Sequence, residues 1–155
     1  MNDLQQKRRK PHYRKPESVK DLEQLYFEYE SRKRPNIPNY ARYKTPFRDD
    51  TANGLTKCIV KWLEAHGYFS ARINTQGNYS TKLKRFIHSG SKRGMADITS
   101  IINGRHVSIE VKAGRDQLRP EQLKVKDEVE NAGGIYFVAR TFDNFLEQIN
   151  SIILT

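Results

Sequence analysis

One segment, MADITSIINGRHVSIEVK at residues 95–112, restricts the possible folds more than any other part of the sequence. It places two runs of β-branched residues on either side of Asn103-Gly104, and this dipeptide is the strongest short-range signal for a two-residue β-hairpin turn. We therefore predict an antiparallel hairpin. Because the turn also sets the register, Asp97 on the first strand should face Glu110 on the second.

The facing carboxylates predict a metal site. Like charges that face each other on a sheet destabilise it by roughly tenths to about 1 kcal/mol, so a compensating charge is expected. A hard divalent cation such as Mg²⁺ fits, because it prefers carboxylate oxygens and retains water molecules for chemistry at phosphorus. Lys112 lies two residues after Glu110, and strand alternation therefore places its ammonium group on the same face. Ile109 and Val111 should point to the opposite, apolar face.

Helices and strands are predicted on both sides of the hairpin. The predicted helices cover residues 18–34, 51–66, 120–131 and 142–153, and the further strands cover residues 68–74 and 135–140. Ser18 is placed to cap the first helix. Residues 76–94, rich in Gly, Ser, Thr and Lys, show no periodicity and are predicted to form a substrate-facing loop. This element order predicts an α/β fold in which helices flank a mixed sheet.

The chain is predicted to have two parts. Residues 1–48 form a basic, partly helical N-terminal extension, in which Pro35, Pro38 and Pro46 mark a surface connection. Residues 49–155 form the main domain. Its basic start is consistent with either a nucleic-acid-binding arm or a solubilising tail.

The charge of the chain favours a polyanionic partner. It has 28 Lys and Arg residues against 18 Asp and Glu residues, a formal net charge of +10. Each phosphate neutralised by such cations releases a counterion, which favours nucleic acid, while membrane surfaces and ribosomes are alternatives. A lone cysteine, Cys58, excludes an intramolecular disulfide. No apolar run has the length of a signal or membrane-spanning segment, so a cytoplasmic protein is expected.

Two motifs, KRGMADI at residues 92–98 and SIEVKAGRDQLRPEQ at residues 108–122, together resemble the VRR-NUC branch of the PD-(D/E)XK nucleases. The resemblance extends over about residues 52–145. An E-x-K motif alone is common by chance, whereas this combination with an intervening hairpin is specific. The resemblance implies a restriction-endonuclease-like fold and a metal-dependent DNA endonuclease activity.

The resemblance also implies roles for individual residues. Asp97 and Glu110 would bind Mg²⁺ or Mn²⁺, and the backbone carbonyl of Val111 would complete the ligand set. Lys112 would position and activate water, and Gln122 would orient that lysine or a water molecule. Relatives of this kind act on branched DNA such as Holliday junctions or flaps, often as homodimers, and occur in phage or mobile elements.

The sequence departs from the family pattern in two places. Ala96 stands where the family often has proline, and Asn53 lies near the helix-start position where many relatives carry a glutamate. A third acidic group helps to hold metal, and Asp49 or Asp50 is a possible substitute, whereas Glu64 lies too far along the helix. The missing glutamate motivates an alternative, a catalytically weak or inactive DNA-binding module with a nuclease fold.

Basic residues near the predicted site are candidates for phosphate contacts. We expect nucleic-acid contacts from Lys92, Arg93, Arg115 and Arg119, and Lys82, Lys84 and Arg85 are further candidates. Charged runs often serve only to keep a surface solvated. A ribosome- or RNA-associated protein is another alternative that rests on charge alone, and it leaves the shared register of the two carboxylates and the lysine unexplained.

Overall fold

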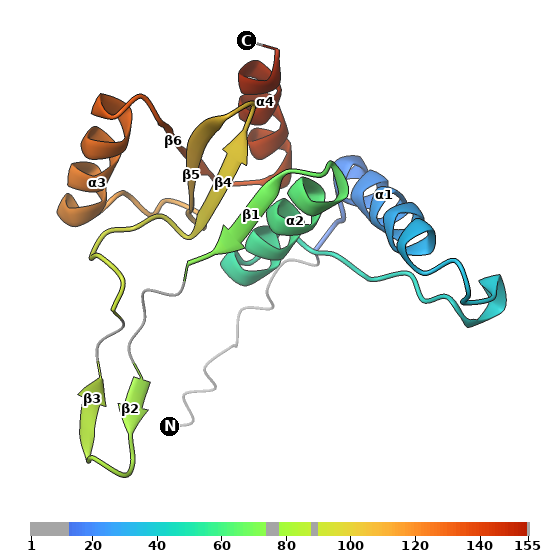
Figure 1. The fold of residues 1–155 in the computed structure, drawn as a ribbon, viewed down its shortest axis with the longest axis horizontal. Coiled ribbons are helices and arrows are strands. Elements are labelled where there is room, and N and C mark those ends of the chain that lie inside the picture. Colours follow the sequence, from blue (N-terminus) through green and yellow to red (C-terminus); the bar gives the residue numbers. More distant parts are fainter. Residues whose placement is uncertain (1–12, 74–77, 88–89, 155) are drawn as a thin grey trace, which may run out of the picture.

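A computed structural model describes residues 13–73, 78–87 and 90–154 of the chain. Its helices are α1 (Glu17–Lys33), the 3₁₀ helix η1 (Asn39–Ala41), α2 (Ala52–Ala65), α3 (Pro120–Asn131) and α4 (Phe142–Ile153). Its strands are β1 (Phe69–Arg72), β2 (Asn78–Ser80), β3 (Arg85–Ile87), β4 (Ile98–Ile102), β5 (Arg105–Val111) and β6 (Ile135–Ala139). A four-stranded mixed sheet with the order β1-β4-β5-β6 lies between helices (Figure 1).

The β4–β5 hairpin confirms the predicted turn and register. Asn103 and Gly104 have φ angles of 50° and 77°, the left-handed values that a type I′ turn requires at both central positions. Ile98 faces Ile109, which is the register predicted from the turn. On the far side of β5, β6 runs parallel to it, and α3 forms the crossover between the two.

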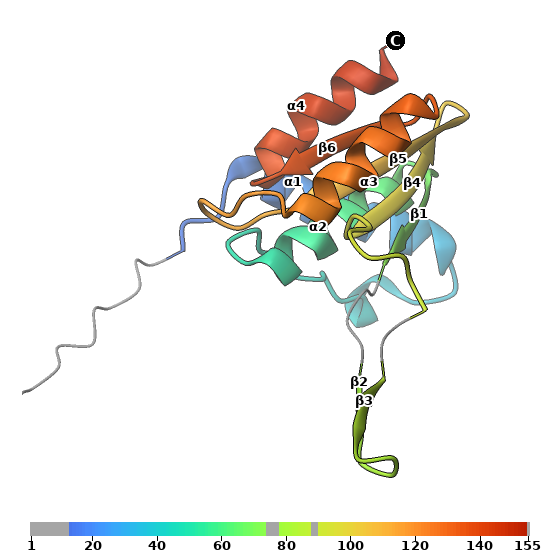
Figure 2. The ribbon, with the colours of Figure 1, turned by 90° about the vertical axis from the view of Figure 1, so that its left-hand side faces the viewer.

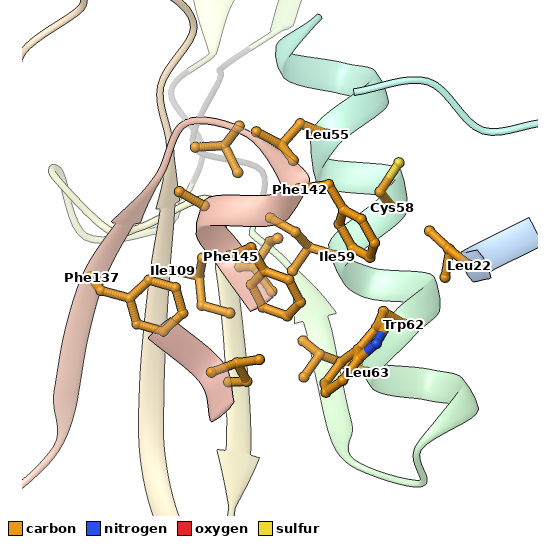
Figure 3. Packing of buried hydrophobic residues seen from close by; sticks show 14 of the residues in the cluster. Leu22, Leu55, Cys58, Ile59, Trp62, Leu63, Ile109, Phe137, Phe142 and Phe145 are labelled. Atoms are coloured by element: carbon orange, nitrogen blue, oxygen red, sulfur yellow. The ribbon is translucent and has the colours of Figure 1, made fainter. Parts of the chain in front are cut away.

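The larger apolar cluster lies on the sheet face that α1, α2 and α4 cover. Ile98, Ile109 and Val111 point into it from the sheet, as strand alternation predicted. Figure 3 shows how α2 and α4 meet this face through Leu55, Cys58, Ile59, Trp62, Leu63, Phe142 and Phe145. Helix α1 contributes Val19, Leu22 and Tyr26 to the same cluster, so part of the predicted extension shares the core of the main domain.

The opposite sheet face carries a smaller cluster under α3. Its buried members are Ala96, Val125 and Tyr136, and Met95, Leu118 and Val129 pack around them. Figures 1 and 2 show α3 alone on this side of the sheet. The chain therefore uses one face of the sheet mainly for stability and leaves the other thinly covered.

Two local predictions were wrong. Helix α1 begins at Glu17 with Pro16 at its N-cap, so Ser18 lies inside the first turn and does not cap the helix. The predicted loop at 76–94 contains a second antiparallel hairpin, in which β2 pairs with β3. Within the predicted ranges, Asn74 and residues 76–77 and 88–89 lie outside the described residues.

The other predicted elements are confirmed to within a few residues at their ends. Thr51 caps α2 by accepting a hydrogen bond from the Gly54 amide, and Gly67 follows the helix with a φ of 76°. Gly133, with a φ of 83°, separates α3 from β6. No helix within the described part of the chain is both long and apolar enough to cross a membrane.

Candidate functional site

Asp97 is the residue immediately before β4, and both its backbone and its side chain are held in place. Its carbonyl accepts a hydrogen bond from the Ile73 amide at 2.7 Å, which continues the pairing of β1 with β4. Its carboxylate Oδ2 accepts a hydrogen bond from the Val111 amide at 2.9 Å. The side chain therefore takes over the role of a backbone carbonyl at the end of the β4–β5 ladder, and this anchors the carboxylate beside Glu110.

Gly94 explains how the chain reaches Asp97. Its φ of 82° is a left-handed conformation that glycine adopts without strain. A Cβ atom at this position would lie 2.2 Å from the Glu121 carbonyl oxygen, which belongs to the first turn of α3. Only glycine allows this close approach, so the loop before Asp97 lies directly against the helix that carries Gln122.

Glu110 is a buried carboxylate with one partnered oxygen. The residue is 3% exposed. Its Oε1 lies 3.0 Å from the Lys112 ammonium nitrogen and accepts a hydrogen bond from Gln122 Nε2 at 2.5 Å. Its Oε2 is buried and has no hydrogen-bond partner among the described residues. A buried, unpaired carboxylate oxygen is unfavourable unless a ligand satisfies it.

The environment of Glu110 raises the pKa of its carboxyl group above the ordinary value. Burial is the largest cause, since it disfavours the charged form. The neighbouring Asp97 carboxylate also raises this pKa, while the hydrogen bonds and charge of Lys112 and the amide of Gln122 lower it. The balance shows that the carboxylate is not fully compensated by the residues around it.

Lys112 and Gln122 form one hydrogen-bonded unit with Glu110. The Lys112 ammonium group, on a residue that is only 9% exposed, donates to Gln122 Oε1 at 2.9 Å. The same oxygen accepts a hydrogen bond from the Arg119 amide at 3.0 Å, which caps the start of α3. Gln122 therefore contacts the lysine, as the family resemblance implies, and it also couples the site to the N-terminus of α3.

The segment between Lys112 and α3 is held by Arg140, which follows β6. Its guanidinium group donates to the Gly114 carbonyl at 2.9 Å and to the Asp116 carbonyl at 2.8 Å. These two bonds fix the course of the chain as it leaves β5. Sequence analysis did not identify Arg140, because its partners are backbone atoms of a loop.

The four predicted nucleic-acid contacts are distributed around this site. Arg93 and Arg119 line an open hollow together with Gln122. Arg115 is exposed in the loop that Arg140 holds. Lys92 is ion-paired with Glu128 of α3. Three of these cations are therefore available on the surface beside the site, and their contact with nucleic acid remains a prediction.

The carboxylates fit a hard divalent cation that takes few ligands from the protein. Asp97, immediately before β4, and Glu110, on β5, supply carboxylate oxygens, and Glu110 Oε2 has no partner among the described residues. Mg²⁺ commonly binds through one or two carboxylates and keeps several waters, so two acids are sufficient for this mode. No group of three or more His, Cys, Asp and Glu side chains within the described ranges could hold a metal ion.

The proposed substitutes for the family glutamate are engaged elsewhere. Asn53, at the start of α2, accepts a hydrogen bond from Arg72 of β1 at 2.7 Å. Asp49 accepts hydrogen bonds from the Tyr13 hydroxyl and the Phe142 amide. Asp50 is held by Arg48. The prediction that Asp49 or Asp50 supplies a third metal ligand finds no support in these contacts.

Tyr136, on β6, is a neighbour of the site that sequence analysis did not identify. Its ring packs in the small cluster under α3, but its hydroxyl is buried without a hydrogen-bond partner among the described residues. Burial, and then the charges of Glu110 and Asp97, raise the pKa of this hydroxyl. Only the parallel register, which places Tyr136 opposite Ser108, reveals that it shares the face of Glu110.

Comparison with known proteins does not assign the chain to a family. No protein-family model matches the sequence, and no curated protein matches it. The site is therefore interpreted from its own geometry, and the resemblance of its motifs to the VRR-NUC nucleases remains an expectation.

Proposed function

We propose that this protein is a metal-dependent nuclease that hydrolyses phosphodiester bonds in DNA. The observation that carries the proposal is the unit formed by Asp97, Glu110 and Lys112: Glu110 is paired with a nearly buried lysine, and the Asp97 carboxylate is held by the Val111 amide between them in sequence. The motif resemblance to the VRR-NUC branch of the PD-(D/E)XK nucleases supports the same function, and a restriction-endonuclease-like fold is part of the proposal.

Each residue of the unit has a role that follows from its contacts. Asp97 and Glu110, whose Oε2 has no partner among the described residues, would hold Mg²⁺ or Mn²⁺. The motif resemblance implies the Val111 carbonyl as a further ligand. The bound cation would polarise the phosphodiester and neutralise its charge. Lys112 is oriented by Glu110 and Gln122, so its ammonium group can position a water molecule and stabilise the charge that develops on phosphate oxygens.

The substrate class follows from charge and from the motif resemblance. The net charge of +10 favours a polyanion, and Arg93, Arg115 and Arg119 lie exposed around the site. We propose branched DNA, such as junctions or flaps, as the preferred substrate, with a homodimer placing two sites on one junction. A cytoplasmic setting is part of the same proposal.

A DNA-binding module without turnover is the second candidate. One observation favours it: the helix-start position where relatives carry a glutamate is Asn53, whose side-chain oxygen is bonded to Arg72. With two acids in place of three, metal affinity would be lower. Such a protein would bind DNA without a metal requirement and would not cleave it.

A cleavage assay separates these candidates. Labelled four-way junction, flap and linear duplex DNA are incubated with the purified protein in EDTA, Mg²⁺ or Mn²⁺. We expect cleavage in the metals only, and a rate lower by roughly 10²–10³-fold in Lys112→Met. Glu110→Gln should lose metal-dependent cleavage. Glu121→Gln, the same chemical change at an exposed position beside Gln122, should cleave normally.

Two other outcomes are informative. Cleavage that persists in EDTA, or that is unchanged in Glu110→Gln, contradicts the proposed site. Tight DNA binding without cleavage in any metal favours the binding module. Circular dichroism of each variant shows whether the fold is retained.

A further inference from the structure

The second hairpin, β2–β3, contributes no residue to the proposed site. In Figures 1 and 2 it stands away from the body of the protein, while all other strands lie in the central sheet. Neither hydrophobic cluster contains a residue of this hairpin, as far as the structure describes its side chains. An ordered hairpin without a role in the core is a candidate for a binding element.

The hairpin is inserted at the end of the sheet where the site lies. The chain leaves the sheet after β1, which ends at Arg72 opposite Ile98, and returns to it at Asp97. The hydrogen bond between the Ile73 amide and the Asp97 carbonyl closes the base of this insertion. The insertion that carries the hairpin therefore starts and ends beside Asp97, the first predicted metal ligand.

The hairpin surface is basic. Its sequence NYSTKLKRFI, at residues 78–87, has three basic and no acidic residues. Lys82, Lys84 and Arg85 are exposed, and none forms an ion pair with another residue that the structure describes. Unpaired, exposed cations on a projecting ribbon are suited to phosphate groups, because each contact releases a counterion.

An apolar residue occupies the turn between these cations. Leu83 is 53% exposed, and Tyr79 on β2 is 61% exposed. The turn is held by a hydrogen bond from the Leu83 amide to the Ser80 hydroxyl oxygen at 3.1 Å and by a left-handed Lys84 with a φ of 49°. Leu83 is therefore presented to solvent by a defined turn, with basic residues on both sides.

We infer that the β2–β3 hairpin is a DNA-binding arm of the proposed nuclease, with Leu83 as an apolar wedge. Lys82, Lys84 and Arg85, at the outer end of the arm, bind backbone phosphates at a distance from the cleavage site. An apolar wedge that enters between bases must unstack them, which costs free energy in continuous duplex. Leu83 therefore gains apolar contact mainly where the bases are already unstacked. The arm thus favours DNA with a branch or a strand discontinuity over continuous duplex. This inference rests on the proposed function for its substrate.

Binding measurements in EDTA test the arm separately from cleavage. The full-length chain, its Lys82→Ala/Lys84→Ala/Arg85→Ala variant and its Leu83→Ala variant are titrated against four-way junction and linear duplex DNA at several salt concentrations. An Arg32→Ala/Lys33→Ala/Arg34→Ala variant, which removes the same charge near the end of α1, is the matched control. Circular dichroism verifies that all variants fold.

The cations and the wedge should change different quantities. Loss of three phosphate contacts should weaken binding to both DNAs and reduce the slope of log K against log salt by up to about 2.7, at roughly 0.9 per contact. The α1 control should keep the original slope. Leu83→Ala should also keep the slope but lower the preference for the junction over the duplex.

The possible results separate the arm from the nuclease. If the triple hairpin variant binds DNA like the α1 control, the proposal of a DNA-binding arm is overturned. The same holds if the full-length protein binds no DNA. An unchanged junction preference in Leu83→Ala overturns the wedge. If binding of an RNA duplex depends on the three cations more strongly than binding of DNA does, the proposal that DNA is the partner is overturned. Weakened binding in the hairpin variant, without cleavage in any metal, would support the arm while the nuclease proposal fails.

Discussion

The two faces of the central sheet have different roles: one packs the hydrophobic core, and the other carries the candidate site. The difference is visible between two adjacent residues. Ile109 and Glu110 are neighbours on β5, and both are buried. Ile109 points into the large cluster beneath α1, α2 and α4, whereas Glu110 lies on the face of α3 and has an unsatisfied oxygen. The comparison teaches that one well-packed face can support a neighbouring face whose buried charges are unfavourable until a ligand is bound.

The largest expected effect is on the apolar face. Ile109→Ala should lower the free energy of unfolding by about 2–5 kcal/mol, because it removes buried methyl groups and leaves a cavity. Ile101→Ala, the same change at an exposed position of β4, should alter it by less than about 0.5 kcal/mol. Urea denaturation measures both. At a temperature where Ile109→Ala remains folded, its cleavage should persist, and a loss of cleavage there would weaken the division between the faces.

The next effect concerns metal and pH on the site face. At about 100 times its dissociation constant, Mn²⁺ should raise the free energy of unfolding by about 2.7 kcal/mol. Protons compete with Mn²⁺ for Glu110, whose pKa is raised, so this stabilisation should be complete above the raised pKa and should decrease progressively as the pH falls below it. Thermal unfolding in Mn²⁺ and in EDTA across a pH series measures the difference.

The sign of this pH effect reverses without metal. Burial favours protonated Glu110, so in EDTA its contribution to folding stability is present at low pH and decreases as the pH rises through the raised pKa. The two unfolding curves should therefore converge in acid. Glu110→Gln should abolish the Mn²⁺ effect at all pH values, and a full Mn²⁺ effect in this variant would place the metal elsewhere.

The smallest effect is expected at Tyr136. Its buried hydroxyl has no hydrogen-bond partner among the described residues, so Tyr136→Phe should leave the ring in the small cluster and remove an unsatisfied polar group. We expect the free energy of unfolding in EDTA to stay the same or to rise by about 1 kcal/mol. A decrease of that size in urea denaturation would show that the hydroxyl has a partner in solution.

Local signals account for what the sequence predicted well. The Asn103-Gly104 turn sets the register of β4 and β5 without tertiary information, so the positions of Asp97, Glu110 and Lys112 could be inferred together. The helix predicted at residues 51–66 is likewise present, as α2 at Ala52–Ala65. The four-stranded mixed sheet between helices also follows from the order of these elements.

What the sequence did not predict depends on contacts between distant segments. The parallel register of β5 and β6, which brings Tyr136 to the face of Glu110, has no local turn to set it. The β2–β3 hairpin lacks the alternating apolar pattern of a strand that packs on a core, so its residues resembled a loop. The burial of Lys112 depends on Gln122 of α3, which periodicity alone does not reveal.

The contact of Gly94 with α3 has a consequence for how precisely the two halves of the site are aligned. One half, Asp97, follows the loop that contains Gly94, and the other half includes Gln122, which directly follows Glu121. With backbone against backbone and no side chain between them, a shift of α3 must be transmitted to the loop. The backbone contact therefore fixes the spacing between the loop before Asp97 and the first turn of α3, and the side-chain hydrogen bonds of Lys112 and Gln122 are built on that spacing.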